Sequence, residues 1–154
     1  MATLQEMFDV RGKSVIVTGG ASGIGRAYAE VMADNGARVC IFDLNPTQLD
    51  CVVAELKAGG GDVWGQVVDV ADRARMKEAF DAVAERHGRI DVVFANAGID
   101  AGPGFLSTTG ERIPDGAIDV LDDHHWDRVI EVNLSSVYMT VKHSARHMKA
   151  TCGG

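Results

Sequence analysis

The chain has 154 residues, 46% of them hydrophobic and 24% charged, and its formal net charge is −7 at pH 7. This composition is ordinary for one globular domain with its own core. The acidic balance, with Lys and Arg scattered along the chain, argues against nucleic acid and anionic membranes as partners. No apolar stretch is long enough to span a bilayer. Because Cys40, Cys51 and Cys152 lack metal-ligand spacing, we expect no metal site and reduced thiols in a cytoplasmic protein, with Cys40 buried in a strand.

Strand and helix patterns alternate in the first half of the chain. Residues 13–18 and 38–42 are short apolar runs that predict buried strands. The helix between them ends at Gly36, and its predicted buried face consists of Ile24, Ala27, Tyr28, Val31 and Met32. A second helix begins at Asn45 and ends at the glycines 59–61. Its predicted buried face consists of Leu49, Val52, Val53 and Leu56.

The second half continues the alternation. Residues 63–70 and 91–95 predict a third and a fourth strand. The helix between them has a predicted buried face of Met76, Ala79, Phe80, Val83 and Ala84. Residues 99–123 form one long irregular loop, of a length that is usually functional or partly disordered in a compact domain. A last helix covers about residues 124–149, with an apolar stripe of Trp126, Ile130, Val137, Val141 and Met148. The alternation indicates an α/β fold with a parallel sheet.

A glycine-rich segment joins the first strand to the first helix. Gly19, Gly23 and Gly25 lie in it, with Ser22 and Ile24 between them. A glycine turn between a strand and a helix lets the backbone approach a pyrophosphate, and the free N–H groups of the helix start face its negative charge. The glycine triplet alone is a weak signal, but this position strengthens it.

Polar residues also follow the other predicted strands. Asp43, followed by Leu44, ends the second strand, where an acid accepts both ribose hydroxyls of an adenosine and repels the 2′-phosphate of NADP. NAD is therefore the expected cofactor. The alternative for Asp43 is a solvated acid at a strand end. Asp69-Val70 ends the third strand and Asn96-Ala97-Gly98 follows the fourth, so four strand ends carry candidate ligand contacts on one edge.

These residues resemble the N-terminal signature of the classical short-chain dehydrogenases/reductases. The matching pattern is Thr18-Gly19-x-x-x-Gly23-x-Gly25, Asp43, Asp69-Val70, Asn96-Ala97-Gly98 and Asn133. The resemblance implies a Rossmann-type doubly wound parallel sheet with strand order 3-2-1-4, the family's C-terminal strands being absent from this chain. It also implies that Asp69 contacts the adenine amino group and Val70 flanks the ring. Asn96 would steady the central sheet, and Gly98 would leave room for the cofactor.

Asn133 is the candidate catalytic residue of this chain. It matches a helix asparagine that, in this family, holds a water molecule in a proton relay. It also interrupts the apolar stripe of the last helix, and a buried amide needs hydrogen-bond partners. A structural asparagine bonded to backbone remains the alternative.

The resemblance also implies a catalytic Ser and a later Tyr-x-x-x-Lys pair that residues 1–154 do not supply. We expect these on a further C-terminal polypeptide, and we expect residues 1–154 to be an NAD-binding portion that is inactive alone. Tyr138 and Lys142 have the Tyr-x-x-x-Lys spacing, but no strand separates them from Asn133. We interpret them as two side chains on one helix face. His143 and His147 share a face as metal ligands do, but they lack a third ligand and predict a solvated or interface face.

The main functional hypothesis is an oxidoreductase that transfers a hydride between NAD(H) and an alcohol or ketone. The loop 99–123 would then lie near the substrate entrance. A non-catalytic NAD(H)-binding sensor or scaffold is the alternative. A third interpretation is an assembly piece, since the resemblance implies a homo-oligomer, a dimer or a tetramer, built through the last helix. The residues expected to pair subunits are Leu134, Tyr138, Val141 and Ala145.

Overall fold

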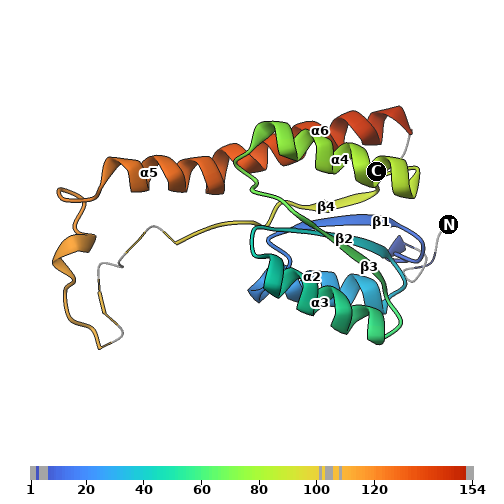
Figure 1. Ribbon diagram of the computed structural model, residues 1–154, viewed down its shortest axis with the longest axis horizontal. Helices are drawn as coiled ribbons and strands as arrows, with labels where there is room; N and C mark the ends of the chain where they lie inside the picture. The colour runs from blue at the N-terminus through green and yellow to red at the C-terminus, as the bar shows by residue number, and fades with distance from the viewer. Residues whose placement is uncertain (1–2, 4–6, 101, 103–105, 108, 152–154) are drawn as a thin grey trace.

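The structure is a computed structural model that describes residues 3, 7–100, 102, 106–107 and 109–151, so Cys152 lies outside the described residues. Its centre is a parallel four-stranded sheet of order β3-β2-β1-β4 (Figure 1). The strands are β1 (Ser14–Thr18), β2 (Arg38–Asp43), β3 (Asp62–Val67) and β4 (Val92–Phe94). The predicted fold class and strand order are confirmed. The third strand was predicted too long, because the chain leaves the ladder after Val67 and runs toward the cleft described below.

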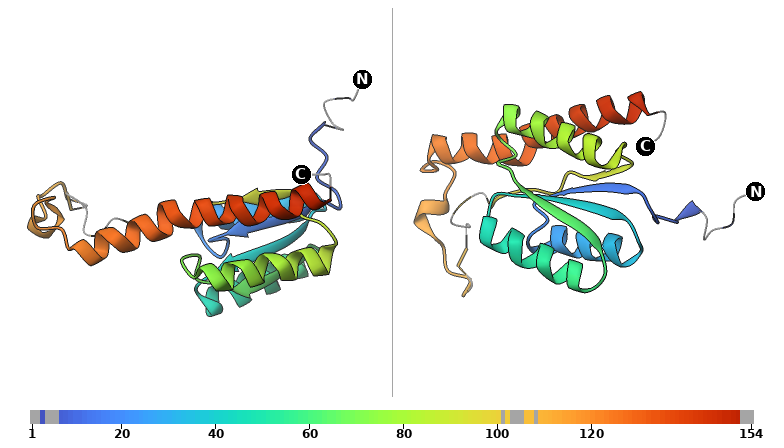
Figure 2. Two further views of the ribbon diagram at one scale, coloured as in Figure 1. Left: turned by 90° about the horizontal axis from the view of Figure 1, so that it is seen from above. Right: turned by 45° about the vertical axis from the view of Figure 1, so that its right-hand side comes forward.

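Helices cover both faces of the sheet. On one face lie α2 (Gly23–Asp34) and α3 (Pro46–Ala58), and on the other lie α4 (Arg73–His87) and α6 (Ser136–Ala150), as Figures 1 and 2 show. Side chains alternate along the central strands, so Val15 and Val39 pack with α2 and α3 while Ile16 and Phe42 pack with α4. All four are fully buried, and burial of each contributes roughly 1.5–3 kcal/mol to folding. The sheet is therefore fixed from both sides.

The predicted core faces hold for two helices and fail for most of α2, where Met32 alone of the predicted residues packs, half-buried, against the core. In α3 and α4 the buried side chains are those of the predicted stripes, with Val53 and Ala84 half-buried and His87 buried in addition. In α2, Ile24 and Val31 are 69% and 57% exposed, and Tyr28 is 40% exposed. The buried positions are instead Gly25, Ala29 and Ala33. These small residues repeat every fourth position, so they share one helix face and bring the helix axis close to the sheet.

The last helix is not continuous. It consists of α5 (Asp123–Ile130), a π-helical segment η2 (Glu131–Ser135) and α6, which together form a long rod reaching beyond the sheet (Figures 1 and 2). The predicted apolar stripe does not form its buried face, because Trp126 is 52% exposed and Val141 57% exposed. The rod buries a different face, which comprises Val132, Ser136, Met139, Thr140, His143 and Ser144.

The segment 99–123 leaves the sheet and returns to the start of α5 (Figure 1). Its described residues include an isolated antiparallel bridge between Leu106 and Arg112 and a short 3₁₀ helix η1 (Pro114–Gly116). The segment is thus mostly irregular, as predicted, with local turns of its own. Asp122 caps α5 by accepting a hydrogen bond from the N–H of His125, at 3.0 Å.

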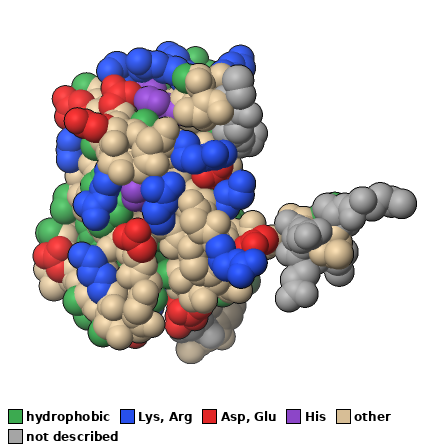
Figure 3. Space-filling view, turned by 90° about the vertical axis from the view of Figure 1, so that its right-hand side faces the viewer, with side chains coloured by type: hydrophobic (Ala, Val, Ile, Leu, Met, Phe, Trp, Pro, Cys, Tyr) green, Lys and Arg blue, Asp and Glu red, His purple; other side chains and the backbone are tan. Residues whose placement is uncertain are grey.

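The surface mixes charges of both signs. On the face shown in Figure 3, Lys and Arg side chains alternate with Asp and Glu. Several surface charges of the protein are paired, including Lys77 with Asp81 at 2.6 Å and Arg75 with Glu78 at 3.1 Å, both on α4. Among the described residues, no helix is both long and apolar enough to cross a membrane.

A polar network lies at the end of the sheet where the parallel strands begin. His87, at the end of α4, makes a 2.8 Å hydrogen bond with Oγ of Ser14 and accepts one from Nε1 of Trp64 at 3.2 Å. Because Trp64 can only donate, Nε2 of His87 carries no proton and the ring is neutral in this arrangement. Burial, followed by the nearby Arg38 guanidinium, lowers the pKa of His87.

This network predicts a loss of stability in mild acid. With its folded-state pKa lowered, His87 takes up a proton more readily in the unfolded chain, so its contribution to stability is full above about pH 6.5 and falls as the pH drops below that value. Urea unfolding at pH 7.5 and 5.5 measures the effect. The His87→Gln variant should lose less stability over this interval than the unmodified protein. Some dependence should remain, because burial also lowers the pKa of His143.

His124→Gln is the matched control, because His124 is exposed in the first turn of α5. It should show the pH dependence of the unmodified protein. Equal pH dependence in all three proteins would contradict the role assigned to His87.

Candidate functional site

A cleft of about 380 Å³ lies at the carboxyl ends of the strands. Ligands of open parallel sheets bind at this edge, and the volume is in the range of small-molecule sites. Every predicted cofactor residue lines it except Gly25: Gly19, Ser22, Gly23, Ile24, Asp43, Leu44, Asp69, Val70, Asn96, Ala97 and Gly98. The residues predicted from the sequence to contact a cofactor therefore line one common cleft, with the exception of Gly25.

The glycine segment forms one wall of the cleft. Gly19 has φ of +65° and Gly23 +51°, a backbone region in which side chains other than glycine are strained. Ser22 precedes α2 without a side-chain cap, and the first turn of the helix contains no acid. The first N–H groups of α2 thus stay available to a ligand, and the helix dipole favours an anion there.

Gly25 supports the cleft from beneath instead of lining it. A Cβ at this position would lie 2.1 Å from the carbonyl oxygen of Gly19 and 2.5 Å from Nδ2 of Asn96. A Cβ at Gly19 would in turn lie 2.8 Å from Cα of Ala97. Gly25 thus has a packing role, since its missing side chain lets α2 meet the end of β1, and a contact of Gly25 with a ligand stays a prediction.

Thr18 and Asn96 hold the two central strand ends together. The hydroxyl of Thr18 accepts hydrogen bonds from the N–H groups of Asn96 and Ala97, both at 3.0 Å, and donates to the carbonyl of Phe94 at 3.3 Å. Nδ2 of Asn96 donates to the carbonyl of Thr18 at 3.2 Å. These bonds fix the glycine segment against the chain that leaves β4, in line with the sheet-steadying role that the resemblance implied for Asn96.

Asp43 faces the cleft from the end of β2. Its Oδ2 accepts a hydrogen bond from the N–H of Ala21 at 2.9 Å, and its Oδ1 accepts one from the N–H of Asn45 at 3.0 Å. The carboxylate is therefore fixed by backbone on both oxygens. An ionised carboxylate has about four acceptor positions, so it can still accept from a ligand hydroxyl.

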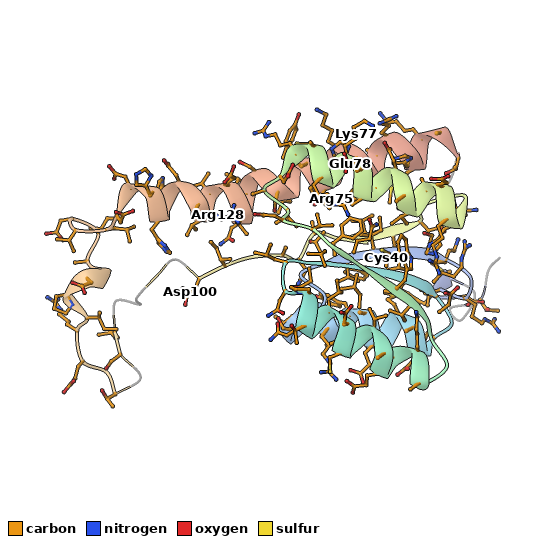
Figure 4. The ribbon with its side chains drawn as sticks, viewed as in Figure 1. Cys40, Arg75, Lys77, Glu78, Asp100 and Arg128 are labelled. Carbon is orange, nitrogen blue, oxygen red and sulfur yellow. The ribbon has the colours of Figure 1, made fainter. Side chains whose placement is uncertain are left out.

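Asp69 contacts a cation that sequence reasoning missed. Its Oδ1 accepts a hydrogen bond from the N–H of Ala71 and its Oδ2 one from Nη2 of Arg128, each at 2.9 Å. Arg128 lies on α5 and also pairs with Glu131 at 3.3 Å. The pKa of Arg128 is raised because its guanidinium donates a hydrogen bond to Asp69 and, as a smaller cause, to Glu131. Figure 4 shows Arg128 on α5, above the segment that carries Asp100.

Other cleft residues also went unpredicted: Phe42, Val68, Ile99, Arg128 and Val132. A signal for the last two is in the sequence, because Arg128 and Val132 are four residues apart and share a helix face. The apolar spacing instead predicted a buried face that contains Trp126 and Ile130.

Asn133 lies in η2, outside the cleft lining. It is exposed, contrary to the buried position expected from the stripe. Its Oδ1 accepts from the N–H of Ile99 at 2.8 Å, and its Nδ2 donates to the carbonyl of Ile99 at 2.9 Å. This is the backbone-bonded arrangement that the sequence left as the alternative. It anchors the start of the 99–123 segment to the rod, and a role in proton transfer stays a prediction.

The Tyr138 and Lys142 side chains form a pair on the surface of α6. Nζ of Lys142 lies 5.9 Å from the ring centre of Tyr138, which is 59% exposed. Neither residue lines the cleft. The pair therefore has the geometry of two neighbours on one helix face, as predicted.

The His143–His147 face, predicted to be solvated or at an interface, packs against α4 of the same chain and is not solvated. His143 is buried against Phe80, with ring centres 5.8 Å apart, and Nε2 of His147 lies 2.9 Å from Oδ1 of Asp81. Burial, followed by the nearby Lys142, lowers the pKa of His143. Within the described residues, no group of three or more His, Cys, Asp or Glu is arranged to hold a metal.

The glycine wall, the carboxylates of Asp43 and Asp69 and the Asn96 junction surround one cleft, and a family comparison bears on it. A model of the short-chain dehydrogenase family matches residues 13–154. The chain belongs to the short-chain dehydrogenase family. Its parallel sheet with alternating helices is the Rossmann-like fold of that family.

Its relatives in this family include enzymes with different substrates. The chain is 35% identical to D-threitol dehydrogenase of Mycolicibacterium smegmatis, a match that covers 100% of this chain and 56% of that enzyme. It is 36% identical to a 3-oxoacyl-(acyl-carrier-protein) reductase of Thermotoga maritima, over 84% of this chain and 47% of that enzyme. The chain thus spans about half the length of the curated relatives it matches.

Solved structures of the family share the fold. A short-chain dehydrogenase/reductase from Burkholderia phymatum in complex with NAD is 31% identical, with a TM-score of 0.83 over 94% of this chain and 47% of that one. A metagenomic short-chain oxidoreductase in complex with NADP is 28% identical, with a TM-score of 0.82 over 95% of this chain and 61% of that one.

The contact beneath the cleft predicts that Gly25→Ala destabilises the protein. The new Cβ would overlap the Gly19 carbonyl, and overpacking of this kind costs about 1–3 kcal/mol. Urea unfolding measures the change. Gly59→Ala is the control, because Gly59 has an ordinary α-helical backbone and its Cβ would meet nothing closer than 3.4 Å. Equal stability of the two variants would contradict the proposed contact.

Proposed function

We propose that this chain binds NAD(H) in the cleft and forms the cofactor half of an oxidoreductase acting on an alcohol or ketone. The observation that carries the proposal is Asp43, a carboxylate fixed beside the glycine segment at the end of β2. In a dinucleotide site, an acid at this position accepts the hydroxyls of the adenosine ribose. When bound, NAD(H) supplies or takes up the hydride.

The charges around Asp43 favour NAD over NADP. A 2′-phosphate would meet the Asp43 carboxylate, and the nearby cations are engaged elsewhere. Arg26 pairs with Glu55 at 2.8 Å, and Arg128 pairs with Asp69 and Glu131. Because one solved relative contains NAD and another NADP, the choice rests on these side chains.

The remaining parts of the proposal concern the other end of the cleft. The resemblance places a Ser and a Tyr-x-x-x-Lys in the proton-transfer chemistry, and we assign these to further polypeptide that completes the enzyme. The chain from Gly98 into the segment 99–123 leaves the strand ends beside Asn133, and we propose that this segment borders the substrate entrance. Asn133 would hold its first residue in place, whether or not it also holds a relay water.

Replacing Asp43 tests the cofactor assignment. Asp43→Asn keeps the size of the side chain and one acceptor oxygen but removes the charge. By titration calorimetry, we expect NAD affinity to fall about tenfold and NADP affinity to rise, because charge-assisted hydrogen bonds are lost and the repulsion of the 2′-phosphate is relieved. Asp50→Asn, an exposed acid on α3, should leave both affinities unchanged. An unaltered NAD-to-NADP preference in Asp43→Asn would refute the assignment.

An exposed apolar surface on the rod supports the proposed homo-oligomer. Leu134, Tyr138 and Val141 are 63%, 59% and 57% exposed and lie about one helical turn apart. They leave large apolar side chains uncovered, the kind of surface that pairs subunits.

Tyr138→Glu tests this surface. A charge in the centre of a paired apolar surface is costly, so we expect a smaller assembly by size exclusion with light scattering. Lys57→Glu, on α3 at the opposite face of the sheet, should keep the assembly of the unmodified protein. The surface has no role in assembly if Tyr138→Glu elutes as the control does.

A further inference from the structure

Arg128 is the one described basic residue of the cleft lining, and the function proposed above gives it no direct task. Two carboxylates already neutralise it, since Nη2 contacts Asp69 at 2.9 Å and Nη1 contacts Glu131 at 3.3 Å. A guanidinium paired in this way is a poor receptor for a further phosphate. Its surroundings thus point to a role exerted through Asp69.

The order of the sheet places this pair at one end of the cleft. With order β3-β2-β1-β4, the amides at the start of α2 lie at β1, Asp43 at the end of β2, and Asp69 beyond the end of β3. A dinucleotide with its pyrophosphate at α2 and its adenosine ribose at Asp43 would have its adenine at Asp69 and Val70, as the resemblance implies. The nicotinamide end then points toward β4 and Gly98.

The carboxylate of Asp69 is held from two sides. The N–H of Ala71 fixes Oδ1 and the guanidinium of Arg128 fixes Oδ2, each at 2.9 Å. The Asp69 side chain is 35% exposed, so without Arg128 one side would be free to turn toward solvent. With both contacts, the carboxylate keeps one orientation and still has acceptor positions for a ligand N–H.

Resting on the proposed function, we propose that Arg128 is a positioning residue for base recognition: it orients Asp69 so that the site selects a purine with an exocyclic amino group. The site then prefers adenine, whose amino group donates a hydrogen bond, over hypoxanthine, which presents a carbonyl oxygen to the same carboxylate. The carbonyl oxygen and the carboxylate are both acceptors, so they repel each other, and the exocyclic group of the base donates no hydrogen bond to Asp69. Arg128 acts on this preference from α5, through its contact with Asp69.

The experiment measures binding of NAD and of nicotinamide hypoxanthine dinucleotide by titration calorimetry, with the complete protein. The unmodified protein should prefer NAD by about tenfold or more, the effect of one hydrogen bond to a charged group. Arg128→Gln should reduce this preference several-fold. Arg128→Lys, which retains one charged donor, should recover part of it.

Two controls separate positioning from a merely structural role. Arg75→Gln removes a comparable exposed Arg pair, with Glu78 on α4, outside the cleft lining (Figure 4), and should leave the preference intact. Asp69→Asn should abolish the preference, and the double variant Arg128→Gln/Asp69→Asn should be no worse than Asp69→Asn alone. Such non-additivity is expected when one residue acts through the other.

The outcomes distinguish this inference from the function on which it rests. If the unmodified protein binds NAD but Arg128→Gln keeps the full NAD preference, or only lowers the melting temperature, the positioning role is overturned and NAD binding stands. Additive effects in the double variant also overturn it. If the unmodified protein takes up no NAD, the proposed function fails, and the inference fails with it.

Discussion

The structure depends on the close approach of two backbones at the end of β1. The carbonyl of Gly19 lies where a side chain on Gly25 would be, and Ala97 lies where a side chain on Gly19 would be. The hydroxyl of Thr18 and the amide of Asn96 then join the same point to the chain leaving β4. This junction sets the start of α2 against the strand ends, so helix amides and carboxylates face one cleft.

The strand ends could be predicted because their signals are local. A polar residue after a short apolar run marks the end of a buried strand, and parallel strands bring such ends to one edge. Asp43, Asp69 and Asn96 were found in this way, and they do line a common cleft. The buried faces of α3 and α4 were also predictable, because each has an apolar face next to a polar one.

The faces of α2 and of the α5–α6 rod were not predictable by the same rule. Apolar spacing shows which side chains avoid water but not which surface covers them. In α2 the sheet side is made of Gly25, Ala29 and Ala33, while Ile24 and Val31 face outward. In the rod, the π-helical segment changes the turn near Asn133, and small or polar residues such as Ser136 and Thr140 are buried instead. The contact of Arg128 with Asp69 could not be predicted either, because it joins residues that are far apart in the chain.

On α2 the smallest side chains, and not the largest, are the ones that tolerate substitution least. Ala29 is fully buried and Ala33 nearly so, with the sheet directly beneath them, so even one added methylene group has little space. Val31, a larger side chain, is exposed and bears little of this constraint within the described chain. Ala29 and Ala33 should thus limit which substitutions α2 accepts, because they set the distance of the helix and its dipole from the strands.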